Sequence, residues 1–346
     1  MKFAILLLVL SLVIPLHVNA AELSAPAPPE HAEQLMPAQP NSFGQDLLYI
    51  IKQALMALHP SLTEAITTCV SLVAVIIFIS ILKGFDGVSK RTVLLVGTIF
   101  ISIILIRSSK SLIQLGVQTV SEISEYGRMF LPIITTALAA EGGVTSSAAL
   151  YAGTIAFDML LTTLISKLIV PLVYVFLVLC IASRGLKDDM LNKVRDFIKW
   201  IITWSMKVTL YAFTGYISIT GVISGTADAA AVKAAKLAIS GSVPVVGSIV
   251  SDASETILVS AGIMKNSVGV YGVAAIIALW IVPFLKIGMQ YIMLKITTAV
   301  CSIFGTKETV GLISDFSESM GFLVGMTGTV SIMLLISTVC FMKGIS

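Results

Sequence analysis

The strongest constraint on this chain is a series of apolar runs with the composition of membrane-spanning helices. A transmembrane helix needs about 20 predominantly apolar residues, and only helices or closed barrels satisfy their backbone polar groups inside hydrocarbon. We therefore expect an all-α, polytopic membrane protein with about six full membrane-spanning helices. These spans are predicted over residues 62–82, 92–106, 168–182, 200–222, 268–291 and 321–341.

The composition agrees with a membrane protein and excludes several other classes. Of 346 residues, 57% are hydrophobic and only 12% are charged, which lies outside the range of soluble domains. The three histidines precede the first span, so a histidine metal cage or catalytic dyad is not expected in the core. The four cysteines lie in apolar runs without CxxC spacing, which is typical of buried thiols. A thinly spread net charge of +3 indicates no nucleic-acid partner, and no cofactor motif is present.

The N-terminal segment predicts export and a surface helix. Residues 1–20 have the basic start, apolar core and small-residue end of a signal peptide, and cleavage would leave the mature N-terminus extracytoplasmic. An uncleaved membrane anchor is the alternative. Residues 21–41 are rich in proline and lack aromatic residues, so we expect a disordered extracytoplasmic tether. Residues 42–60 predict an interfacial amphipathic helix.

A first membrane repeat is predicted over residues 92–183, after a first span and cytoplasmic loop at residues 61–91. Its short span is followed by residues 107–129, where polar side chains form a stripe opposite apolar ones. That division predicts a second interfacial helix. Residues 130–140 are only half a span, with Pro132 near the start.

The first predicted hairpin is completed by a break in the chain and a longer helix. The break falls at Glu141, Gly142 and Gly143, and residues 146–166 continue as a helix. Non-helical backbone at membrane depth survives only where protein or a water-filled cavity satisfies its polar groups. The break is therefore a candidate functional feature.

A basic cluster at residues 184–199 gives the clearest indication of topology. Five of these residues are Lys or Arg, which by the positive-inside rule places the segment in the cytoplasm. We expect an amphipathic cytoplasmic linker helix whose apolar face docks a partner. The residues on that face are Leu186, Met190, Val194 and Phe197.

A second membrane repeat is predicted over residues 200–294, and its centre is the most broken apolar stretch of the chain. At residues 239–272 we expect a re-entrant or membrane-surface hairpin, because Pro244 removes a backbone donor between two glycines. The candidate functional residues of this hairpin are Gly241, Pro244, Gly247, Asp252 and Glu255. Residues 295–346 are expected to form a cytoplasmic connector, to residue 318, and the last span.

The two repeats align without a gap when Pro132 is placed on Pro244 and Pro171 on Pro283. Each half then reads as span, surface helix, Pro/Gly-broken hairpin and span. Both halves start and end in the cytoplasm, so the internal repeat is expected to be parallel.

Three ionisable residues are predicted inside the spans or beside them, namely Asp158, Lys207 and Lys286. An unpaired charge in hydrocarbon is costly, so such groups face a cavity or each other. With Asp252 and Glu255 they could form a polar path, or ion pairs between helices, or residues at the membrane interface. An intramembrane protease would need a motif around Asp158 and Asp252 that the chain lacks, so we expect no enzyme.

The amino-acid sequence of the central stretch resembles that of a known protein family. The segment KxAKxxxSGSVPVVGSIVSDASETILVSAGIMKNSVGVYGV, together with EGGVTSSAA at residues 141–149, is similar to stage III sporulation protein AE of endospore-forming bacteria. The resemblance extends from about residue 72 to the C-terminus and is densest at residues 228–273.

This resemblance implies a membrane-embedded core or platform subunit of a channel complex between mother cell and forespore, needed for late forespore gene expression. The implied partners are the other stage III sporulation A-series proteins, including a secretion-type ATPase, and indirectly a forespore protein of the stage II Q type. The implied location is the mother-cell membrane around the forespore. A stand-alone permease for a small solute or peptide, gated by the two broken hairpins, is the alternative.

Overall fold

The described part of the chain is built from helices. The computed structural model describes residues 25–37, 43–85, 89–140, 144–186, 188–219 and 267–343, and these ranges contain no strand, which confirms the all-α class. The helices are α2 (Glu30–Glu33), α3 (Phe43–Ala57), α4 (His59–Leu82), α5 (Lys90–Ala140), α6 (Val144–Leu164), α7 (Val170–Leu186), α8 (Asp189–Ile219), α11 (Ser267–Cys301) and α12 (Lys307–Lys343). A π-helical turn, Ile165–Ile169, joins α6 to α7 without a break.

Five helical segments of the described chain are long and apolar enough to cross a membrane, which confirms a polytopic membrane protein. They are His59–Leu82, Lys90–Thr136, Leu150–Leu186, Val268–Cys301 and Lys307–Met342. One predicted span, at residues 200–222, is not among these five and begins within α8. Lys207 and several Thr and Tyr residues make this helix less apolar than the other five.

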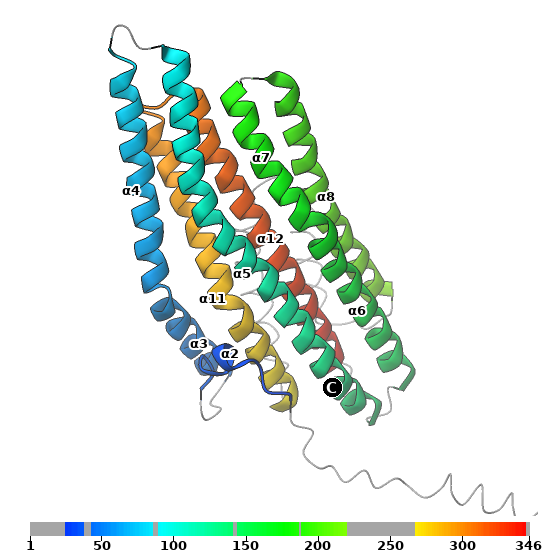
Figure 1. Cartoon of the computed structure of the whole chain (residues 1–346). Helices are drawn as coiled ribbons and strands as arrows, with labels where there is room; N and C mark the ends of the chain where they lie inside the picture. Colours follow the sequence, from blue (N-terminus) through cyan, green and yellow to red (C-terminus); the bar gives the residue numbers. More distant parts are fainter. Residues whose placement is uncertain are drawn as a thin grey trace, which may run out of the picture.

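The long helices form one bundle in which neighbouring chain segments run antiparallel, with α6 and α7 counted as one continuous helix (Figure 1). α4, α7 and α11 end, and α5, α8 and α12 begin, at the same end of the bundle, which we call the loop end. α3 and the C-terminus of α12 lie toward the opposite end. The three chain segments predicted to be cytoplasmic, near residues 83–91, 184–199 and 295–318, therefore meet at one end of the molecule.

α12 is the central helix of the bundle. It packs against α11, α5, α7, α6 and α8. In its most apolar stretch of 18 residues 89% is buried by the rest of the protein, compared with 28% for the corresponding stretch of α4. Glycines allow close contact: a Cβ atom on Gly272 of α11 would lie 2.1 Å from the ring of Phe130. Gly321 of α12, which begins the small-residue motif Gly321-x-x-x-Gly325, faces Tyr291 of α11, so this glycine serves contact inside the bundle.

The prediction of three separate elements between residues 92 and 140 is wrong, because α5 is one helix of 51 residues. The polar stripe is present: Gln114 and Gln118 are exposed while Ile113 and Val120 are buried. The segment is therefore the surface of a long, half-buried helix instead of a separate interfacial helix. Pro132 lies inside α5, where neighbouring helices can compensate for the missing backbone donor.

The expected separation of residues 146–166 from residues 168–182 is also wrong, since helix continues from α6 into α7. Pro171 has no N–H to donate to the carbonyl of residue 167, and its ring would clash with that carbonyl in a regular α-helix. The π-helical turn Ile165–Ile169 lies directly before it. A wider turn of this kind accommodates the proline without ending the helix.

The boundaries at the loop end also differ from the prediction, because side chains cap new helices there. Residues 184–199 are not one helix: Asp188 accepts a hydrogen bond from the Met190 backbone N–H at 2.7 Å and starts α8. The expected connector at residues 295–318 shrinks to residues 302–306. Thr306 and Thr309 exchange hydrogen bonds between side chain and backbone N–H, which starts α12 at Lys307.

Part of the N-terminal segment predicted as a tether packs against the bundle. Part of the expected tether, residues 25–37, is described and contains α2, with Ala32 fully buried. α2 packs against α11, and His31 lies 3.4 Å from Glu122 of α5. α3, Phe43–Ala57, covers most of the helix predicted at residues 42–60; it buries Ile50 and Ala54, whereas Leu48 and Leu55 are exposed.

Candidate functional site

Most residues of the two predicted hairpins lie outside the described residues. These are Glu141, Gly142, Gly143, Gly241, Pro244, Gly247, Asp252 and Glu255. The central hairpin and the parallel internal repeat therefore stay predictions. In the first hairpin Pro132 does not turn the chain, because α5 continues to Ala140, and α6 begins at Val144.

Asp158 forms the polar contact between α5 and α6. Its side chain is 5% exposed and accepts a hydrogen bond from the Ser124 hydroxyl at 2.5 Å. Arg128, one turn further along α5, lies 3.9 Å from the same carboxylate oxygen. Three roles were predicted for Asp158: part of a polar path, an ion pair between helices, or a residue at the membrane interface. This geometry favours the ion pair between helices.

Lys207 and Lys286 are half-buried on α8 and α11. Lys286 forms no ion pair with any described residue. One turn after it on α11, the buried Gln290 donates a hydrogen bond to the Ser108 hydroxyl of α5 at 3.1 Å. The two acidic residues that could pair with such a lysine, Asp252 and Glu255, lie outside the described residues.

The four predicted docking residues are exposed at the loop end. Leu186 lies on α7, and Met190, Val194 and Phe197 follow at helical spacing on α8, with Met190 73% exposed. Phe197 stacks on Trp200, which stacks on Trp204, with ring centroids 6.0 Å and 5.6 Å apart. We call Leu186, Met190, Val194 and Phe197 the docking surface.

A cluster of charged side chains around the buried Asp315 lies at the loop end, on α7, α8 and α12. Asp315 of α12, 6% exposed, accepts hydrogen bonds from Arg184 Nε at 2.8 Å and Nη2 at 3.1 Å. Arg195 of α8 donates to the same carboxylate at 3.0 Å. One turn further along both helices, Lys199 pairs with Glu318 at 2.8 Å. We call Arg184, Arg195, Lys199, Asp315 and Glu318 the Asp315 cluster.

The electrostatics of the Asp315 cluster fix three helices together. Burial opposes the charge of Arg195, but the carboxylates of Asp315 and Asp196 outweigh it and raise the pKa of Arg195. The guanidinium of Arg184 lies against Gly311, where a Cβ atom would come within 2.6 Å of it. Bidentate arginine–carboxylate pairs are strong and geometrically specific. The cluster therefore sets the positions of α7, α8 and α12 at the loop end.

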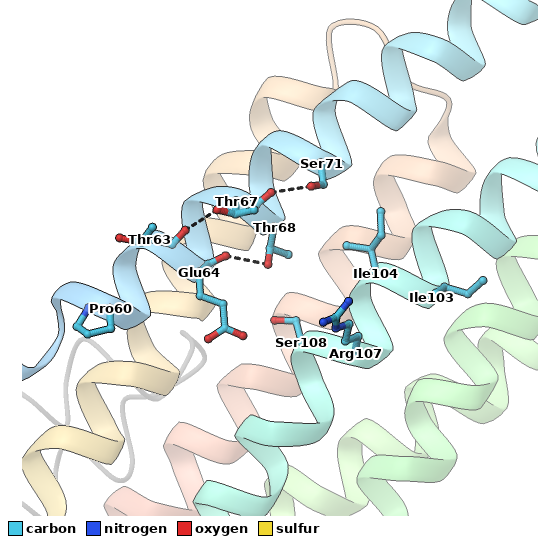
Figure 2. Close-up of a pocket in the computed structure, with 10 residues that line it drawn as sticks. All are labelled: Pro60, Thr63, Glu64, Thr67, Thr68, Ser71, Ile103, Ile104, Arg107 and Ser108. Atoms are coloured by element: carbon cyan, nitrogen blue, oxygen red, sulfur yellow. Dashed lines mark hydrogen bonds between the residues drawn. The ribbon is translucent and has the colours of Figure 1, made fainter.

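A polar groove between α4 and α5 is the second candidate site (Figure 2). Its volume is about 610 Å³. α4 contributes Pro60, Thr63, Glu64, Thr67, Thr68 and Ser71. α5 contributes Ile103, Ile104, Arg107 and Ser108. This concentration of polar groups between two apolar helices is unusual at a membrane-facing surface.

Neither the Asp315 cluster nor the groove was predicted from the sequence. Asp315 and Glu318 stand three residues apart in the predicted connector, and the basic residues at 184–199 indicated only topology. A search for acidic residues able to pair with that basic cluster would have found them. In the described part of the chain no group of three or more His, Cys, Asp or Glu residues forms a metal site, and none of the four cysteines, all of which lie in that part, forms a disulfide.

Comparison with known proteins identifies relatives of the chain. The family model for stage III sporulation protein AE matches residues 33–344. A stage III sporulation protein AE from Bacillus subtilis (strain 168) is 24% identical over 226 residues, covering 65% of this chain and 56% of the relative. The aligned part thus spans little more than half of that relative's length. No solved structure matches the chain.

Proposed function

Since the chain belongs to the stage III sporulation protein AE family, we propose that it is a membrane-embedded core or platform subunit of a sporulation-specific transport channel. The channel links mother cell and forespore and is needed for late forespore gene expression and spore formation. The subunit sits in the mother-cell membrane around the forespore and performs no catalysis itself. Its mature N-terminus is extracytoplasmic.

The observation that supports a platform role is the loop end of the bundle. There the docking surface exposes apolar side chains to the cytoplasm or the membrane surface, and the Asp315 cluster at the same end fixes α7, α8 and α12. An interface is strong when its exposed anchors sit on a rigid support, because little conformational entropy is lost on binding. We infer that this surface binds another stage III sporulation A-series protein, and the secretion-type ATPase is one candidate. A forespore stage II Q-type protein is an indirect partner.

The test is co-purification of a tagged chain from sporulating cells at engulfment. The wild type should retain A-series proteins, whereas Met190→Asp with Val194→Asp should lose the partner at the loop end and abolish spore formation at an unchanged protein level. Met190→Lys with Val194→Lys separates the two possible contacts. Lysine is tolerated at a lipid headgroup surface, so normal spore yield from the lysine pair would show that these residues contact lipid, which contradicts the assignment.

Transport by the chain alone would support the stand-alone permease instead. The purified protein in proteoliposomes should move no small solute or peptide across the bilayer if it works as a platform. Solute uptake without any other subunit would overturn the proposed role.

A further inference from the structure

Two opposite charges face the groove between α4 and α5 from its two walls. Glu64 projects from α4, and Arg107 lies on α5 beside Ser108 (Figure 2). Neither side chain forms an ion pair with a described residue. A carboxylate and a guanidinium that share one groove without pairing leave room for a ligand that contacts both.

The α4 wall of the groove offers mainly hydrogen-bond acceptors. The hydroxyls of Thr67, Thr68 and Ser71 donate their protons to backbone carbonyls one turn earlier, at 2.8 to 3.0 Å. Their oxygen lone pairs stay available. The Glu64 carboxylate adds further acceptors, so this wall suits a group that carries several N–H donors and a positive charge.

The α5 wall donates hydrogen bonds. Arg107 offers the donors of its guanidinium. The Ser108 oxygen accepts from Gln290 at 3.1 Å, which leaves the Ser108 proton to donate. This wall suits an anion, and arginine in particular fits the geometry of phosphate oxygens.

We propose that the groove binds a zwitterion in which a primary ammonium lies against the Glu64 wall and a phosphate against Arg107. The volume of about 610 Å³ is that of a small-molecule site. Two sources share this chemistry: the headgroup of a phosphatidylethanolamine, and a soluble phosphoethanolamine.

The depth of the groove in the bilayer favours the lipid. On α5, large apolar side chains are exposed as far as Ile103 and Ile106, and the exposed residues that follow, Arg107, Lys110 and Gln114, are polar. Basic side chains at such a boundary mark the level of lipid headgroups. The groove opens at that level.

The experiment measures which lipids the purified full-length chain retains. The protein in detergent is incubated with equal amounts of phosphatidylethanolamine, phosphatidylcholine and phosphatidylglycerol, passed over a sizing column, and its lipids are quantified. The quaternary ammonium of phosphatidylcholine cannot donate hydrogen bonds, and phosphatidylglycerol has no cation. We expect phosphatidylethanolamine to exceed both by about tenfold. Equal retention of the three lipids would overturn the proposal.

Matched variants connect this retention to the groove. Glu64→Gln and Arg107→Gln should each reduce phosphatidylethanolamine to the level of the other two lipids. Glu125→Gln and Lys110→Gln remove the same charges from exposed positions on α5 outside the groove, and they should retain the lipid as the wild type does. Loss of retention in the control variants, or none in the groove variants, would contradict the assignment.

A competition experiment distinguishes the two sources. Soluble O-phosphoethanolamine, added in excess over the lipid, should not displace phosphatidylethanolamine, because it lacks the acyl chains that contact the apolar helix surfaces. Displacement at a concentration similar to that of the lipid would assign the groove to a soluble zwitterion and overturn the lipid assignment. The site does not depend on the proposed channel role, and its test needs no sporulating cells.

Discussion

At the scale of single residues, Asp315 connects three helices through one carboxylate. Arg184 reaches it from the end of α7 and Arg195 from the start of α8. Taking ions out of water is costly, and the pairing compensates for that cost only when the geometry is good and both partners are present. Removing one partner therefore lowers the free energy of unfolding by more than the complete interaction contributes to it.

Asp315→Asn should lower the stability of the folded bundle markedly, because it leaves two cationic groups facing a neutral amide. Breaking a buried pair costs roughly 3–5 kcal/mol, which should appear as a lower unfolding temperature of the protein in detergent. Asp196→Asn is the matched control: Asp196 also pairs with Arg195, at 2.9 Å, but its side chain is 63% exposed. Exposed pairs contribute about 0–1 kcal/mol. Equal effects of the two substitutions would show that Asp315 does not fix these helices.

Single charged residues were only partly predictable from the sequence. Asp158 stands in a run of apolar residues, so its burial and its need for a partner could be predicted. Its partners Ser124 and Arg128 could not, because they come from α5, a helix whose course was not recognised. Asp315 lay in a segment expected to be a hydrated connector, where a carboxylate needs no partner.

At the scale of elements, Pro132 did not divide the chain as predicted, because it lies inside α5. Pro283 likewise lies inside α11, as expected for the span at residues 268–291, and Pro171 follows a π-helical turn. Proline ends helices in water because the freed carbonyl and the lost hydrogen bond have no compensation along a single helix. In a packed membrane bundle neighbouring groups supply that compensation. Local propensity therefore predicted breaks that tertiary packing removes.

Close contact between α11 and α5 depends on glycine, and one substitution tests it. Gly272→Ala would place a methyl group 2.1 Å from the Phe130 ring. Forcing extra volume into a packed core costs typically about 1–3 kcal/mol, so the unfolding temperature should fall. Gly288→Ala, in the same helix, meets no atom within 4 Å and should raise stability by up to about 1 kcal/mol through helix propensity. A stabilising Gly272→Ala would contradict the observed contact of the two helices.

At the scale of the whole molecule, charge predicted the arrangement better than helix boundaries did. The Lys and Arg residues at 184–199 set the predicted orientation, and the three segments predicted as cytoplasmic converge on the loop end, although several of their limits were wrong (Figure 1). The charge of a segment beside a span stays the same when a helix end is misplaced by a few residues. The predicted number of helices, in contrast, changes with every break that is wrongly assigned. The fold class, most spans and the common side of the loops were therefore predictable. The packing order around α12 was not, because apolar faces carry little partner specificity.

Orientation in the membrane can be measured by cysteine accessibility. In a variant without the native cysteines, Asp189→Cys at the loop end should escape an impermeant maleimide in intact protoplasts, and Gln45→Cys on α3 should react. Both positions are exposed on the protein, so both should react after lysis. The expectation rests on the positive-inside rule, and the reverse labelling pattern would invert the orientation of the whole bundle.

The unbroken length of α5 makes the bundle a mechanical link across the membrane. At 1.5 Å per residue, its 51 residues extend about 77 Å, whereas the hydrocarbon core is about 30 Å thick. Even at a tilt of about 40° the helix spans nearly twice that thickness. α12 runs beside it for 37 residues without interruption. A push or rotation applied to α12 at the loop end is therefore carried as a rigid-body movement to the far side of the bilayer.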